Sequence, residues 1–93
     1  MTRMRASAEG VPNASAATYY SERTIRGSLL ISEGVVVSTR GRGFPNTPGL
    51  YSEQQVQAWK SITKAVKEKG GVFFAQVWYV LTITMLLWIR LTI

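Results

Sequence analysis

The hydrophobic positions of the chain predict two short strands, each preceded by a helix. Residues 29–37 are apolar on both faces except at Ser32 and Glu33, a pattern typical of a parallel strand that is covered on both sides. Residues 72–80 form a second run of this kind. The order helix, strand, helix, strand favours a parallel sheet, so the sequence predicts an α/β fold.

Capping residues and apolar spacing predict the two helices. Asn13 or Ser15 can cap a first helix over about 15–26. The second helix is predicted more clearly, because Ser52 and Gln55 have the spacing of a capping box. Its apolar stripe, spaced by three and four residues, consists of Val56, Trp59, Ile62 and Val66.

The C-terminal part of the chain supports two interpretations. No charged residue occurs from Gly70 to Ile89, and a helix of this length would reach ~30 Å, enough to cross a bilayer. In the first interpretation, a unit over residues 1–80 ends in a strand and is followed by an unrelated apolar tail, 81–93. In the second, the chain is a small tail-anchored membrane protein with one helical span near residues 72–89. The residues alone leave both open.

Composition excludes several kinds of site. The 93 residues contain no Cys and no His. A disulfide framework, a zinc site of the Cys/His kind and thiol or Ser-His nucleophiles are therefore excluded within this chain. The formal net charge of +6 suggests a nucleic-acid partner, but the basic residues are dispersed, and four lysines over residues 60–69 are typical of a solvated helix face. We expect no metal site and no nucleic-acid partner.

The two ends of the chain bear on its location. No apolar core follows Arg3 and Arg5, so the N-terminus does not have the pattern of a secretory signal peptide. The final residues, 91–93, are Leu-Thr-Ile and not a peroxisomal tripeptide. We expect a cytoplasmic location by default, with membrane association through residues 72–89 as the alternative.

Gln76 is the polar exception in the second strand. It interrupts a run of large apolar residues near the strand's end, where a polar side chain needs a partner. Neighbouring backbone can supply that partner. Alternatively, the amide faces a ligand at the carboxyl end of a parallel sheet, where α/β sheets and barrels bind cofactors. Gly34 is expected at a comparable level of the first strand, and two such positions at one edge favour a ligand site.

Seven collinear blocks over about 79 residues carry a more specific signal. They are MTRMRA (1–6), PN (12–13), YYSER (19–23), LLISEG (29–34), GFPNTPG (43–49), QVQAWK (55–60) and QVW (76–78). Together they resemble the N-terminal part of the Old Yellow Enzyme family of flavoproteins, particularly the plant-type 12-oxophytodienoate reductases. The resemblance stops at Leu81.

The resemblance implies a (β/α)8 TIM barrel that binds FMN, of which this chain would supply about the first three βα units. In this family NADPH reduces the flavin, which then reduces an α,β-unsaturated carbonyl compound, here an enone of the oxylipin type. By position, Met1 and Thr2 match flavin-contacting residues at the end of the family's first strand. Gly34 matches a backbone contact to the flavin, and Gln76 matches the amide that pairs with the flavin pyrimidine edge, for which a group that both donates and accepts is suited.

Of the family's other functional residues, some match substrate-lining positions of this chain and others have no match in it. Trp78 and Phe44 match positions on the substrate side of the pocket, although ordinary aromatic packing is the alternative for both. In the family, a histidine and an asparagine or second histidine polarise the substrate carbonyl, and a tyrosine donates the proton. All of these residues come later in the family's sequence than the part matched by this chain. The resemblance therefore assigns no catalytic residue to this chain, and we expect the chain alone to be inactive, with unpaired sheet edges.

Overall fold

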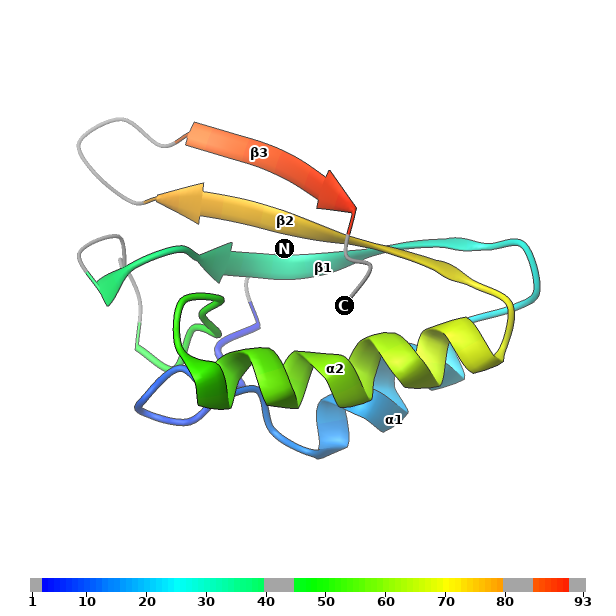
Figure 1. Cartoon of the computed structure of the whole chain (residues 1–93), viewed down its shortest axis with the longest axis horizontal. Coiled ribbons are helices and arrows are strands. Elements are labelled where there is room, and N and C mark those ends of the chain that lie inside the picture. Colours follow the sequence, from blue (N-terminus) through cyan, green and yellow to red (C-terminus); the bar gives the residue numbers. More distant parts are fainter. Residues whose placement is uncertain (1–2, 40–44, 80–84, 91–93) are drawn as a thin grey trace.

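The computed structural model describes residues 3–39, 45–79 and 85–90, and these form two helices and a three-stranded sheet (Figure 1). The elements in chain order are α1 (Ser15–Glu22), β1 (Leu29–Val36), α2 (Glu53–Glu68), β2 (Val72–Tyr79) and β3 (Met85–Arg90). The sheet order is β1-β2-β3. Strands β1 and β2 are parallel, with α2 connecting them, so the predicted α/β fold is confirmed.

Helix α2 begins as predicted. Ser52 is its N-cap, its hydroxyl accepts from the Gln55 amide at 3.3 Å, and the Gln55 side chain accepts in return from the Ser52 amide at 3.0 Å. The predicted stripe is buried at Trp59, Ile62 and Val66. The indole of Trp59 also donates to the Gly49 carbonyl at 3.0 Å, which holds the chain just before the helix against α2.

Helix α1 is shorter than predicted. It ends at Glu22 and not near residue 26, and its N-cap, Ala14, makes no capping bond through a side chain. The hydroxyl of Thr24 donates to the Tyr20 carbonyl at 2.8 Å. Such local hydroxyl bonds compete with the helix, which explains the early end.

The two helices cover one face of the sheet. Side chains of β2 alternate between buried and half-buried, and Phe73, Ala75 and Val77 pack in the core with residues of both helices. Figure 1 shows both helices on the same side of the sheet. The expectation that the strands are covered on both faces therefore holds for residues 32–36 of β1, which are all buried, and is wrong for the start of β1 and for β2. Leu29 and Ile31, on the opposite face, are 59% and 45% exposed.

The membrane-spanning interpretation of residues 72–89 is not supported. Residues 72–79 form β2, and β3 then runs antiparallel to β2, from the pair Tyr79–Met85 to the pair Phe74–Arg90. β-branched and aromatic side chains favour such strands over a helix. In the described parts of the chain, no helix combines the length and the apolar character that crossing a bilayer requires. Of the tail predicted over 81–93, only β3 lies within the described residues.

Candidate functional site at the carboxyl end of the parallel strands

The residues singled out in the two strands meet at one edge of the sheet. Gly34 pairs with Gln76, and two residues further on Val36 pairs with Trp78. The predicted common level of Gly34 and Gln76 is therefore confirmed as a placement. Met1, Thr2 and Phe44 lie outside the described residues.

A β-bulge produces this pairing. Between the pairs Ile31–Phe74 and Gly34–Gln76, strand β1 contains two residues, Ser32 and Glu33, where β2 contains one. Without the extra residue, Glu33 would lie opposite Gln76, and every later side chain of β1 would change face. The bulge is thus the reason that Gly34 lies beside Gln76.

Gly34 gives room to an aromatic side chain. A Cβ atom added at Gly34 would lie 2.8 Å from Cε2 and 3.0 Å from Cζ2 of Trp78. Of the two reasons for a glycine in a strand, a neighbouring element or a ligand, the indole of Trp78 supplies the first. The absent side chain therefore lets the Trp78 ring lie close to the β1 backbone.

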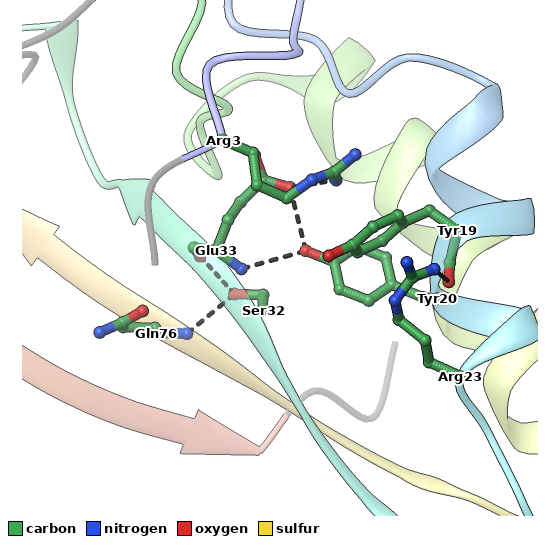
Figure 2. Close-up of polar contacts among 7 residues, drawn as sticks. All are labelled: Arg3, Tyr19, Tyr20, Arg23, Ser32, Glu33 and Gln76. Atoms are coloured by element: carbon green, nitrogen blue, oxygen red, sulfur yellow. Dashed lines mark hydrogen bonds and ion pairs between the residues drawn. The ribbon is translucent and has the colours of Figure 1, made fainter.

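Gln76 lies on the face that the helices leave uncovered. Its neighbours in β2, Ala75 and Val77, are buried against the helices, and successive side chains of a strand point to opposite faces. The Gln76 side chain is half-buried and points away from Tyr20 and α1 (Figure 2). Its backbone N–H donates to the Ser32 hydroxyl at 2.9 Å. The amide group can therefore face a ligand on the uncovered side while the backbone remains fixed.

Behind the bulge lies a buried polar cluster that the sequence did not predict. The Glu33 carboxylate accepts from the Tyr20 hydroxyl at 2.9 Å and from the Arg3 guanidinium at 3.1 Å (Figure 2). The Tyr20 hydroxyl also accepts from the Glu33 amide at 3.0 Å. Burial, and next the Glu33 charge, raise the pKa of Tyr20 well above its usual value. The available signal was the pair Ser32-Glu33, the polar interruption of an otherwise apolar strand.

Two arginines flank the neighbouring aromatic ring. The guanidinium carbons of Arg3 and Arg23 lie 3.6 and 3.7 Å from the centroid of the Tyr19 ring. Two groups this close must occupy opposite faces of the ring, which makes both contacts cation–π interactions. A cleft of about 320 Å³ lies here beside residues 29–33 of β1. Neither Gly34, Gln76 nor Trp78 lines it, so this cleft is separate from the carboxyl-end site.

The described residues contain no cluster of three or more potential metal ligands. What the carboxyl-end site offers is one amide that can donate and accept, beside a flat indole. This combination is suited to binding a planar ring with a polar edge and supplies no acid, base or nucleophile of its own.

A match to a family of flavin enzymes agrees with a site for a planar ring. The model of the NADH:flavin oxidoreductase / NADH oxidase family matches residues 1–83. The chain belongs to this family. 12-Oxophytodienoate reductase 7 of Oryza sativa subsp. japonica is 55% identical over 80 residues, which are 86% of this chain and 20% of that protein.

Solved structures agree with this assignment. An old yellow enzyme homologue from Zymomonas mobilis superposes with a TM-score of 0.81 at 45% identity, over 86% of this chain and 22% of that one. Old Yellow Enzyme from Pichia sp. AKU4542 gives 0.82 at 34% identity, over 86% and 21%. The resemblance predicted from the sequence blocks is confirmed. The chain spans about a fifth of the length of these flavin-oxidoreductase relatives.

Proposed function

We propose that this chain supplies the pyrimidine-edge contacts for FMN in an NADPH-dependent ene-reductase of the NADH:flavin oxidoreductase family. The observation that carries the proposal is the pairing of Gly34 with Gln76 at the carboxyl end of parallel strands. The Gln76 amide is half-buried on the uncovered face. An amide in that place can donate to a flavin carbonyl and accept from a flavin N–H.

Each remaining residue has a proposed part. Met1 and Thr2 would contact the flavin next to Gln76, and the Gly34 backbone amide would complete this edge. Trp78 and Phe44 would line the side from which substrate enters. The bound FMN would supply hydride transfer from NADPH to an enone, with compounds of the 12-oxophytodienoate type as the substrate class.

We further propose that the chain alone does not catalyse this reaction. The residues that would polarise the enone and donate a proton match no position of this chain, which has no His at all. Contacts on an uncovered sheet would also have to offset the entropy lost when ligand and loops become ordered. The site therefore needs the remainder of a barrel to close over it.

The experiment compares the chain with a barrel chimera. In the chimera, residues 1–79 replace the matching segment of rice 12-oxophytodienoate reductase 7. Flavin absorbance per protein and NADPH oxidation with cyclohexenone are measured for both proteins, against a free-FMN control. We expect about one FMN per chimera with enone-dependent turnover, and neither for the 93-residue chain. A folded but colourless chimera would overturn the FMN assignment, and a yellow, active 93-residue chain would overturn the claim of inactivity.

A further inference from the structure

We propose that Tyr20 and Glu33 are positioning residues for the flavin edge: together they clamp the bulge in β1 that places Gly34 beside Gln76. This inference rests on the proposed function. Neither side chain contacts the site itself, because both lie behind β1, on the side of α1 (Figure 2). Their effect on the site passes through the β1 backbone.

The bulge disturbs the backbone pairing, and side chains restore it. The Glu33 amide donates to the Tyr20 hydroxyl at 3.0 Å. On the other side of the strand, the Gln76 amide donates to the Ser32 hydroxyl at 2.9 Å, and that hydroxyl donates to the Glu33 carbonyl at 2.6 Å. Buried backbone groups that lose such partners are costly, so these bonds hold the extra residue in the strand.

The tyrosine is itself held rigidly. Tyr20 is 4% exposed, and its ring packs edge-on against Phe73 at a centroid distance of 5.1 Å and beside Trp59 at 6.4 Å. Its hydroxyl accepts from the Glu33 amide and donates to the Glu33 carboxylate, so one oxygen binds both the main chain and the side chain of the same residue. Arg3 compensates the charge of that carboxylate. Helix α1 and the core thereby fix the backbone at Glu33.

The clamp acts on the site through register. If the bulge relaxes, Gly34 no longer lies opposite Gln76, and the room that Gly34 provides for the Trp78 indole is lost with it. Gly34 and Gln76, the two residues matched to the flavin edge, are then no longer correctly placed relative to each other. Removing one hydroxyl at Tyr20 should therefore weaken FMN binding, although that hydroxyl is remote from the flavin.

The first test uses the 93-residue chain and amide hydrogen exchange followed by NMR. Tyr20→Phe removes the hydroxyl and keeps the ring, and Tyr19→Phe makes the same change at the neighbouring residue, whose ring lies between two arginines. We expect the Glu33 and Gly34 amides to exchange at least roughly tenfold faster in Tyr20→Phe and at the parental rate in Tyr19→Phe. Equal exchange rates in the two variants would overturn the clamp.

The second test measures FMN affinity in the barrel chimera. We expect a roughly five- to thirtyfold weaker Kd in Tyr20→Phe and in Ser32→Ala, and a Kd within about twofold of the parent in Tyr19→Phe. Glu33→Gln keeps an oxygen acceptor for Tyr20 and should retain most of the affinity.

Val66→Ala separates positioning from general stability. Val66 is fully buried in α2 and belongs to the same hydrophobic core as Tyr20, but its aliphatic side chain has no polar atom that could bond the bulge. This variant should lower the melting temperature and leave FMN affinity within about twofold. If Val66→Ala loses FMN as strongly as Tyr20→Phe, the positioning role is wrong. A parental chimera without FMN would instead refute the proposed function, and the exchange experiment would still decide whether the clamp exists.

Discussion

At the residue scale, Gly34 determines how closely Trp78 can approach β1. The space that a Cβ would need is taken by the indole, with contacts of 2.8 Å and 3.0 Å to ring atoms. A tryptophan side chain within a packed sheet has little freedom to move away. The glycine is therefore required by packing on this face, whatever further contact its backbone makes.

We expect Gly34→Ala to destabilise the chain by ~1–3 kcal/mol, because it forces the Trp78 ring out of its place. Urea unfolding of the 93-residue chain measures the effect. The double variant Gly34→Ala/Trp78→Phe replaces the indole by a smaller ring and should recover part of the loss. If the two changes are simply additive, the clash with Trp78 is not the cause.

At the element scale, the link between α1 and β1 depends on one hydroxyl. Tyr20 of α1 binds Glu33 of β1 through two hydrogen bonds within the core. Burial and the nearby carboxylate raise the pKa of Tyr20 in the folded chain above its value of about 10 in the unfolded chain. The folded state therefore binds this proton more tightly.

This linkage predicts a loss of stability in alkali. Since the folded pKa is the higher one, the contribution of Tyr20 is fully present below about pH 10 and decreases as pH rises beyond it. We expect the free energy of unfolding to fall more steeply with rising pH above about pH 10 in the parent than in Tyr20→Phe. Identical slopes in the parent and in Tyr20→Phe would contradict the buried, linked hydroxyl.

The elements also show what a sequence pattern can and cannot predict. The capping box of α2 is local, since Ser52 and Gln55 satisfy each other within one turn. The common level of Gly34 and Gln76 follows from the similar placement of both residues near strand ends. The bulge at Ser32 was not predicted, because its partners are Tyr20 and the backbone of Gln76, which are distant in sequence.

The predicted end of α1 and the helical interpretation of residues 72–89 were wrong for related reasons. The Thr24 hydroxyl bonds the Tyr20 carbonyl and competes with the helix, so α1 ends at Glu22. In the C-terminal part, an uncharged apolar run is compatible with a helix or with strands. Residues 85–90 form a strand because they pair with β2. A local sequence pattern cannot predict such pairing.

At the scale of the whole molecule, the described sheet has an edge strand with exposed apolar residues. Strand β1 lies at one end of the sheet order, and its residues Leu29 and Ile31 are 59% and 45% exposed. Natural sheets usually block such strands with charges or cover them. In relatives about five times longer, additional chain is present beyond the segment matched here.

We expect the isolated chain to self-associate through this edge strand. Ile31→Lys places a charge on the exposed strand and should shift the chain toward monomer in size-exclusion chromatography with light scattering. Ile25→Lys is the matched control, because Ile25 is 74% exposed but lies outside the strands. Equal reduction of association by both variants would assign the effect to net charge alone.

Whether the Gln76 amide binds the polar edge of FMN is decided by the FMN dissociation constant of the barrel chimera carrying Gln76→Leu. Gln57→Leu, on the exposed side of α2, serves as the matched control. Leucine leaves the flavin edge unpaired, at a cost of ~1–3 kcal/mol, so we expect a Kd weaker by roughly five- to 150-fold in Gln76→Leu and unchanged in Gln57→Leu. An FMN affinity in Gln76→Leu equal to that of the parental chimera would contradict it.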